Sequence, residues 1–402
     1  MPAKNLFTYA EPIHELQAAK TFDYQDMAAK LRAKGKDIIS FGIGQPDFPT
    51  PPHIVEAGVQ ALRDGFTRYV SPPGIPELRQ AIAQFTSEFT GAADIQPAEV
   101  LVTAGAKHAM FFAMASCIRP GDEVLIADPS FYSYAHVTRY AGGIPIFLPV
   151  HEETGFTFTI EDVQARVTPK TRMIVLNSPH NPTGGMLSRM TLQATLELAK
   201  EQGILVVSDE IYDHYLYEQG FMSVLEDPDW REFVIYVNSF SKTYAMAGWR
   251  LGYMIACEPA IKRFSLVTAN TVSCTAAFVQ KAGVAALMES QAFFDDVLAQ
   301  YRARRAYLYD ALTRIPGLHT ESPAGAFYFF PNIKQIIQET GRSTEDIAIT
   351  LMEDVGIVAL PGSAFPDTGG EGYLRLSYAL PLPTIKTGIK RLKTGLAEIL
   401  HE

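Results

Sequence analysis

Between residues 99 and 256, short apolar runs rich in β-branched residues alternate along the chain with stretches of helical period. Apolar runs that lack a polar face and are separated by helices are typical of parallel strands covered on both sides. The pattern therefore predicts an α/β fold with a mostly parallel central sheet. The expected strands are 100–103, 123–127, 144–150, 173–176, 204–207, 234–237 and 251–256, and the clearest helices are 107–118 and 191–202.

The pattern changes after about residue 278, where a helical stretch extends to about residue 314. Short strands are then expected at 326–330, 357–360 and 373–377, with a helix at 343–354. This mixed order predicts a smaller α+β domain. The Pro- and Gly-rich segment 42–52 is expected to cross between domains rather than fold alone. We therefore expect a large domain of residues 50–295, and a small domain formed by residues 1–49 and 296–402.

Composition and charge narrow the classes of function. The chain has 402 residues, of which 47% are hydrophobic and 19% charged, a balance typical of a folded globular protein. Its net charge of −10 argues against nucleic-acid binding, which requires a basic surface. The sequence has no apolar stretch of membrane-spanning length, and its first residues lack the apolar core of a signal peptide. The widely spaced Cys117, Cys257 and Cys274 indicate neither a disulfide framework nor a metal site. We therefore expect a cytoplasmic protein.

Polar residues of different kinds follow three of the expected strands, at 177–185, 208–212 and 239–242. Ligands of open α/β sheets bind outside the carboxyl ends of the strands, so one pocket is expected to collect all three groups. Each group also has a simpler interpretation. Asp209 and Glu210 are consistent with the start of a helix, and Asn181 to Gly184 with a plain turn.

Lys242 follows an apolar run, stands between Ser241 and Thr243, and precedes Arg250 by eight residues. A lysine amine can form a Schiff base with an aldehyde, and pyridoxal phosphate is the cofactor that uses a lysine in this way. Such a cofactor needs a carboxylate at its pyridine nitrogen, for which Asp209 is the candidate. Asn181 and Tyr212 are candidates to hydrogen-bond the phenolic oxygen of the ring. The alternative for Lys242 is an ordinary solvated surface lysine.

The phosphate of such a cofactor needs an anion site of its own. Residues 103–107 join an expected strand to a helix, whose N-terminus offers free backbone N–H groups. Ser239 and Arg250 can complete that site, and Phe131 can stack on a flat ring. Gly42-Ile43-Gly44 resembles the start of a dinucleotide-binding motif, but no helix pattern follows it, so we discard that interpretation.

The segments around these residues resemble the signature of class-I/II aminotransferases, which are fold-type I pyridoxal phosphate enzymes. The likeness covers nearly the whole chain and is similar, motif for motif, to the bacterial and archaeal aspartate-aminotransferase-like branch. It rests on residues 44–48, 69, 73–79, 177–184, 208–212, 239–242, 248–253, 361–363 and 375–379.

The resemblance implies catalytic roles for Lys242, Asp209 and Tyr212. It implies that the cofactor is bound by Gly105, Ala106, Lys107, Phe131, Asn181, Asp209, Tyr212, Ser239, Ser241, Lys242 and Arg250.

The resemblance also implies a substrate site and a partner subunit. Arg375 is expected to bind the α-carboxylate of the substrate with help from Gly44 and Asn181, although a solvated arginine at a strand edge is the alternative. Tyr69 is expected to reach the cofactor phosphate of a neighbouring subunit, which implies a homodimer with shared active sites.

The expected activity is transfer of an amino group from an L-amino acid to a 2-oxo acid by a ping-pong mechanism through Lys242. A lyase, a decarboxylating enzyme or an oxidase on the same fold can share these motifs, and a non-catalytic pyridoxal phosphate-binding protein is a further alternative. The sequence does not specify the amino donor, because segment 271–275 has no arginine for a distal carboxylate. The role of residues 17–26 is also left open.

Overall fold

The computed structural model describes residues 9–14, 16, 18, 20–92, 94–365 and 367–401. Its central feature is a seven-stranded sheet in the order β2-β8-β7-β6-β5-β3-β4, in which only β8 runs antiparallel to its neighbours. The mostly parallel sheet predicted from the sequence is confirmed. Its strands are β2 (Val100–Thr103), β3 (Glu123–Asp128), β4 (Ile144–Pro149), β5 (Thr171–Asn177), β6 (Leu205–Asp209), β7 (Val234–Ser239) and β8 (Gly252–Ile255).

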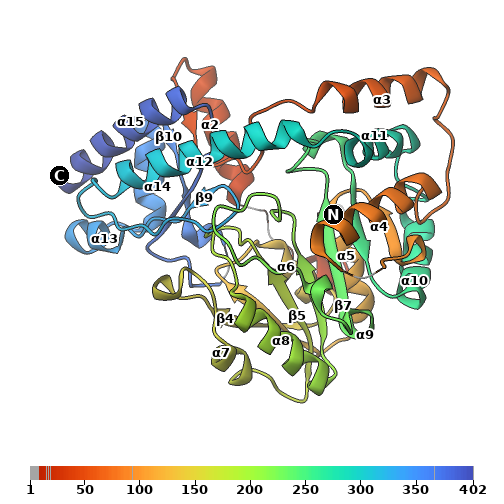
Figure 1. Ribbon diagram of the computed structural model, residues 1–402. Coiled ribbons are helices and arrows are strands. Elements are labelled where there is room, and N and C mark those ends of the chain that lie inside the picture. Colours follow the sequence, from red (N-terminus) through yellow and green to blue (C-terminus); the bar gives the residue numbers. More distant parts are fainter. Residues whose placement is uncertain are drawn as a thin grey trace, which may run out of the picture.

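Both faces of this sheet are buried, which explains why the middle of each strand is apolar on both faces. Along β3, Val124 and Ile126 belong to one core cluster while Leu125 and Ala127 belong to the other. Each large aliphatic side chain buried in this way contributes about 1.5–3 kcal/mol. One face is covered by α5 (Ala106–Cys117), α6 (Ser133–Tyr140) and α10 (Glu258–Thr271), and the other by α4 (Pro76–Thr90), α7 (Ile160–Gln164), α8 (Arg189–Gln202) and α11 (Ala277–Met288). Outside α4, α3 (Pro52–Arg63) packs along α11 (Figure 1).

A second group of elements gathers at one side of the sheet (Figure 1). It contains the antiparallel sheet β11-β12-β9 and the parallel pair β1-β10. Its strands are β1 (Ile39–Ser40), β9 (Tyr328–Phe329), β10 (Ile357–Val358), β11 (Leu360–Pro361) and β12 (Leu374–Ser377), and its helices are α2 (Lys20–Ala33), α13 (Lys334–Thr340), α14 (Thr344–Asp354) and α15 (Leu382–His401). The pairing of β1 with β10 places residues 39 and 40 beside the C-terminal elements.

Two expected elements are each divided in the structure. The helical stretch 278–314 forms α11 and α12 (Ala292–Leu312), because the Gln291 side chain caps the carbonyl groups of Ala286 and Glu289 between them. The expected strand 357–360 becomes β10 and β11, because the chain changes its pairing partner at Ala359.

The helix α12 runs between the two groups of elements (Figure 1). The hydrophobic core of the second group includes both Phe294 and Val297, one on each side of the expected domain boundary. The boundaries at residues 49 and 295 therefore stay a prediction. Within the described ranges, no helix is both long and apolar enough to cross a bilayer.

Candidate active site

The carboxyl ends of β5, β6 and β7 lie side by side, because Asn177 pairs with Asp209 and Asp209 with Val237 in the sheet register. These ends open into a cavity of about 340 Å³ between the sheet and the smaller group of elements. The cavity collects side chains from all three polar segments singled out in the sequence. The predicted site residues that line it are Gly44, Ala106, Lys107, Phe131, Asn181, Asp209, Tyr212, Ser241, Lys242, Arg250 and Arg375.

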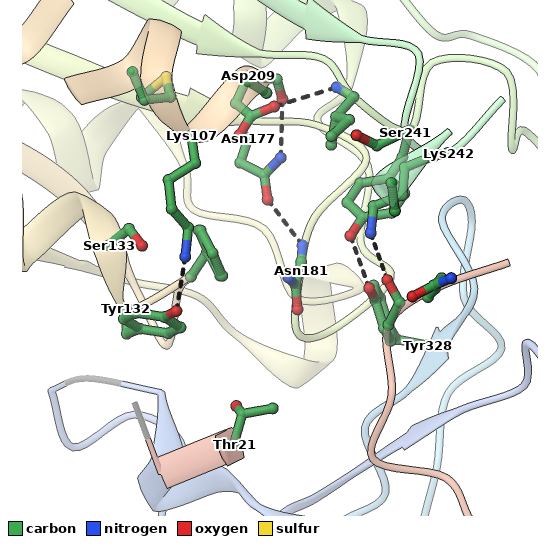
Figure 2. A pocket seen from close by; sticks show the side chains of 18 of the residues that line it. Thr21, Lys107, Tyr132, Ser133, Asn177, Asn181, Asp209, Ser241, Lys242 and Tyr328 are labelled. Carbon is green, nitrogen blue, oxygen red and sulfur yellow. Dashed lines mark hydrogen bonds between the residues drawn. The ribbon is translucent and has the colours of Figure 1, made fainter. Parts of the chain in front are cut away.

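Lys242 lies just beyond the end of β7 and points into the cavity (Figure 2). Its Nζ donates a hydrogen bond to the backbone carbonyl of Gly44 and lies 5.7 Å from the ring centres of Tyr212 and Phe327. Burial lowers the pKa of Lys242 to about 8, and the positive charge of Arg375 acts in the same direction. The side chain is thus not a solvated surface lysine. Near neutral pH it can both accept and release a proton.

Asp209 ends β6 and is 6% exposed. Its Oδ2 accepts a hydrogen bond of 2.8 Å from the Tyr134 hydroxyl, and its Oδ1 accepts one of 3.3 Å from the Ile211 backbone N–H. Burial raises the pKa of Asp209 to about 6, although both hydrogen bonds and the charge of Lys242 favour the ionised form. No helix begins here, because residues 211–214 form turns. The helix-cap interpretation of Asp209 is therefore wrong.

Two hydrogen-bonded groups surround the middle of the cavity. The hydroxyl groups of Tyr212 and Tyr328 are 2.7 Å apart. The Asn177 side chain bridges two segments, because its Nδ2 donates to the Asp209 carbonyl at 2.9 Å and its Oδ1 accepts the Asn181 N–H at 2.9 Å (Figure 2). Residues 180–185 do form a turn, so the turn interpretation is also correct, and the turn aims Asn181 into the cavity.

Arg375 approaches from β12 and is only 4% exposed, so the solvated alternative is wrong. Its Nη1 donates to the Asn181 Oδ1 at 2.9 Å, and its Nη2 donates to the Gly42 carbonyl at 2.7 Å. Its Nε has no hydrogen-bond partner among the described residues. The guanidinium stacks 4.6 Å from the ring centre of Tyr328. Burying a cation with an unpaired N–H donor costs free energy unless an anion accepts that hydrogen bond. Arg375 is therefore suited to binding a carboxylate.

A second anion site is formed where Gly105 caps the N-terminus of α5. Gly105 has φ of +89°, and a Cβ there would lie 2.5 Å from the Arg250 Nη2. Arg250 is held by its own contacts, donating to the carbonyl groups of Ala247 at 2.8 Å and Ala104 at 2.9 Å. Exposed helix N–H groups beside an arginine favour a phosphate. Ser239 and Gly105 lie behind this part of the cavity rather than in its lining, and the Ser239 Oγ accepts the Ser241 N–H at 3.2 Å.

Lys107 and Tyr69 lie farther out. Lys107 Nζ donates to the Tyr132 hydroxyl at 2.8 Å and lies 5.0 Å from the ring centre of Phe131. Tyr69 is 87% exposed and does not line the cavity of its own chain. Its expected contact with a neighbouring subunit therefore stays a prediction.

Several residues that complete the cavity were not predicted from the sequence. Tyr134 stands three residues after Phe131 and donates a hydrogen bond to Asp209, but an aromatic residue after a strand is usually a core residue. Tyr328 lies in the aromatic run 327–330, and the sequence pattern does not show that its hydroxyl faces a cavity. Thr21, Phe22 and Gln25 of α2 and Phe365 also line the cavity. Of the segment 17–26 left open earlier, residues 20–26 belong to α2, while residues 17 and 19 lie outside the described residues.

Comparison with known proteins points to one family. The model of the family "Aminotransferase class I and II" matches residues 36–392. The aspartate aminotransferase of Sulfurisphaera tokodaii is 43% identical over 383 residues, which cover 94% of this chain and 95% of that protein. The probable aspartate/prephenate aminotransferase of Aquifex aeolicus is 37% identical over 394 residues, which cover 97% of this chain and 99% of that protein. The solved structure of the aspartate aminotransferase from Thermus thermophilus with maleate superposes with a TM-score of 0.91 at 33% identity, covering 97% of this chain and 100% of that chain. The chain belongs to the class I and II aminotransferase family.

Proposed function

We propose that this aminotransferase uses pyridoxal phosphate, held through Lys242, to move the amino group of L-aspartate to a 2-oxo acid. The observation that carries the proposal is the cavity itself, where a buried lysine of lowered pKa and a buried arginine with a free donor face the same space. When bound, the cofactor supplies an aldehyde for the amino group and an electron-withdrawing ring that stabilises the carbanion. The family generally uses this cofactor.

The residues present fit this cofactor at both of its ends. The α5 N-terminus and Arg250 offer donors for a phosphate, and Gly105 leaves room that a side chain would fill. At the other end, Asp209 is buried with a pKa of about 6, so a cationic ring nitrogen beside it would draw it into the ionised form. Asp209 would thereby keep a proton on that nitrogen. Tyr212 and Asn181 would donate to the phenolic oxygen, and Phe131 would stack on the ring.

The proton transfer at the substrate Cα falls to Lys242. A general base works best when its pKa is close to the operating pH, and burial brings Lys242 to about 8. Arg375 would hold the α-carboxylate by a bidentate contact, and Gly44 lies in the same lining. This grip would keep the Cα–H bond directed toward Lys242 and away from solvent.

The position of Lys107 in the cavity is evidence for an acidic substrate. Among the residues that the structure describes, four cations (Lys107, Lys242, Arg250 and Arg375) and a single carboxylate (Asp209) line the cavity. Three of the cations have the roles given above, which leaves Lys107. Its side chain extends toward Tyr132 rather than toward the α5 N-terminus, and Asn181 lies between it and Lys242 in Figure 2. We assign Lys107 to the distal carboxylate of the substrate, in place of the cofactor role that the sequence suggested.

A panel of amino acids tests this function. Each is added to the loaded enzyme, and conversion of the bound cofactor to its amine form is followed by absorbance. Aspartate should convert it faster than alanine, and Lys107→Met should reduce kcat/KM for aspartate by about tenfold or more while changing alanine little. Tyr132→Phe, which keeps the cation, is the matched control and should retain the preference for aspartate. Equal rates for aspartate and alanine in the wild type would contradict the substrate assignment.

Double-substrate kinetics separate the remaining activities. An aminotransferase should show ping-pong kinetics and stop after one turnover when no 2-oxo acid acceptor is present. Continued product formation without an acceptor would favour a lyase, a decarboxylating enzyme or an oxidase.

The proposal includes a homodimer whose sites are shared. Tyr69 is 87% exposed, and apolar side chains at Leu62 of α3, Leu266 of α10 and Met288 of α11 are also at least 46% exposed. A closed dimer that covers these side chains would bring Tyr69 to the phosphate site of the partner.

A further inference from the structure

We propose that Asp47 and Arg304, which lie outside the cavity, position the backbone segment whose Gly42 and Gly44 carbonyl groups accept hydrogen bonds from Arg375 and Lys242. The inference rests on the proposed function and concerns the segment Phe41 to Phe48, which we call the strap. The strap joins β1 to the start of α3 and passes along the cavity, where Ile43, Gly44 and Gln45 form part of the lining.

Both functional cations depend on the strap for a hydrogen-bond acceptor. Arg375 Nη2 donates to the Gly42 carbonyl at 2.7 Å, and Lys242 Nζ donates to the Gly44 carbonyl. The strap also fits tightly against its neighbours, because a Cβ at Gly44 would lie 2.3 Å from the Tyr328 hydroxyl oxygen. A small movement of the strap would therefore change the direction of Arg375 and the space next to Lys242.

The two ends of the strap are fixed in different ways. Phe41 is part of the backbone network, since its N–H donates to the Val358 carbonyl at 2.9 Å and its carbonyl accepts the Ser377 N–H at 2.7 Å. Beyond Gly42, no backbone–backbone hydrogen bond involves residues 43–48 among the described residues. The next attachment after Phe41 and the two cations is the side chain of Asp47.

Asp47 is bound by two side chains of α12. Its Oδ1 accepts hydrogen bonds from Arg304 Nη1 at 2.6 Å and from the Tyr301 hydroxyl at 3.1 Å. The side chains of Arg304 and Asp47 are 7% and 15% exposed, so solvent screens the pair little. Arg304 also stacks 4.7 Å from the ring centre of Tyr301 and donates to the Gln300 Oε1. The carboxylate is thus fixed by a rigid part of a long helix.

The pair does not touch the substrate site. Asp47 and Arg304 line a separate cleft of about 510 Å³, and none of the residues that the structure describes lines both this cleft and the active-site cavity. Thr50, three residues farther on, is held by Ala245 and Trp249, so the chain after the strap has its own attachment. The ion pair therefore acts on binding only through the position of the strap. These are positioning residues, and their effect should appear mainly in affinity for the α-carboxylate, because Gly42 directs Arg375, while the proton transfer by Lys242 should change less.

The test compares two double variants of the cofactor-loaded enzyme. Asp47→Asn/Arg304→Met removes both charges and so leaves no unpaired buried charge. Glu99→Gln/Arg231→Met is the control, because that pair also joins at 2.6 Å but neither residue lines the active-site cavity or hydrogen-bonds the strap. Binding of succinate, which cannot react because it has no amino group, is measured by calorimetry. Aspartate kcat and KM and the unfolding midpoint are measured in parallel.

We expect Asp47→Asn/Arg304→Met to raise the succinate Kd and the aspartate KM by roughly tenfold or more, while kcat changes by less than about threefold. The control should lower the unfolding midpoint without changing either constant. Arg304→Lys, which keeps the charge but offers a less directional donor, should fall between the wild type and the double variant. Succinate binding within about twofold of wild type in the first variant, or an equal loss in the control, would overturn the proposal.

If the double variant does not fold, Tyr301→Phe replaces it, because it removes only the hydroxyl that donates to Asp47. A raised succinate Kd then supports the proposal, and an unchanged one overturns it. A wild type that does not bind succinate contradicts the aspartate assignment instead. The strap is then tested in the same variants with the deaminated analogue of the amino acid that does convert the cofactor.

Discussion

Replacing Asp209 by asparagine should make the cofactor-free protein more stable at neutral pH while it damages catalysis. Burial raises the pKa of this carboxyl from 3.8 to about 6, so the folded protein resists its ionisation. One pKa unit corresponds to 1.36 kcal/mol, so the ionised carboxylate costs ~3 kcal/mol of folding free energy once the pH exceeds 6. Asparagine has nearly the same shape and carries no charge.

The gain in stability from Asp209→Asn is reduced by the loss of one hydrogen bond. The asparagine oxygen can still accept from the Tyr134 hydroxyl, but its amide nitrogen cannot accept the Ile211 N–H, which is 3.3 Å away in the wild type. That loss costs about 0.5–1.5 kcal/mol, which leaves a net gain of ~2 kcal/mol for Asp209→Asn above pH 6.

The sign of the pH dependence is fixed by the direction of the pKa shift. Below about pH 4 the carboxyl is protonated in both the folded and the unfolded chain, so it imposes no ionisation cost there. As the pH rises from 4 through 6, the wild type loses stability relative to Asp209→Asn. Urea unfolding of both proteins at pH 7.5 and pH 4.5 should therefore show an advantage for the variant that is present at the higher pH and absent at the lower.

Tyr134→Phe is a control that should change the stability in the opposite direction. It keeps the buried charge but removes the hydroxyl that stabilises it, so it should be less stable than wild type at pH 7.5. In the loaded enzyme, Asp209→Asn should slow the half-reaction by at least on the order of 10²-fold, or ~2.7 kcal/mol in the barrier. If Asp209→Asn is no more stable than wild type at pH 7.5, or if its advantage is the same at both pH values, the burial argument is wrong.

Three further outcomes are expected. Borohydride reduction of the loaded enzyme should attach the cofactor to Lys242, and peptide mapping that finds it on another lysine would refute the assignment. Gly44→Ala should raise KM by about tenfold or more, because its Cβ would lie 2.3 Å from the buried Tyr328 hydroxyl oxygen; unchanged kinetics would show that Tyr328 moves freely. Mixed dimers of inactive Tyr69→Ala and inactive Lys242→Ala subunits should regain activity, since one site per hybrid receives both intact residues; hybrids that form and stay inactive would place Tyr69 in the site of its own chain.

The sequence was sufficient to predict the sheet and the residues at its edge. The strands that end at Asn177, Asp209 and Ser239 each contain an apolar run of at least three residues, followed by an abrupt change to polar residues. That change marks both the end of burial and the place where a ligand can bind. Lys242 and Asp209 were therefore predictable from local pattern together with the chemistry of their side chains.

Other parts of the site depend on contacts that no local pattern reveals. Tyr328 reaches Tyr212 from 116 residues away, and Arg304 reaches Asp47 from 257 residues away. An aromatic or charged residue in a helix or short strand looks the same whether it faces solvent, the core or a partner element. The expected strand at 357–360 was divided for a similar reason, since its change of partner at Ala359 is a property of the assembled fold.

The pairing of β1 with β10 has a consequence for how the protein is made. It joins residues 39 and 40 to residues 357 and 358, so the N-terminal segment waits for its strand partner while more than 300 residues are synthesised. Pairing over such a sequence distance is slow, because the entropy of closing a long loop is lost before the stabilising contacts form. Arg375 is translated later still, and it holds the Gly42 carbonyl beside that pair. The proposed carboxylate site at Arg375 is therefore among the last features to form, on the ribosome or after release.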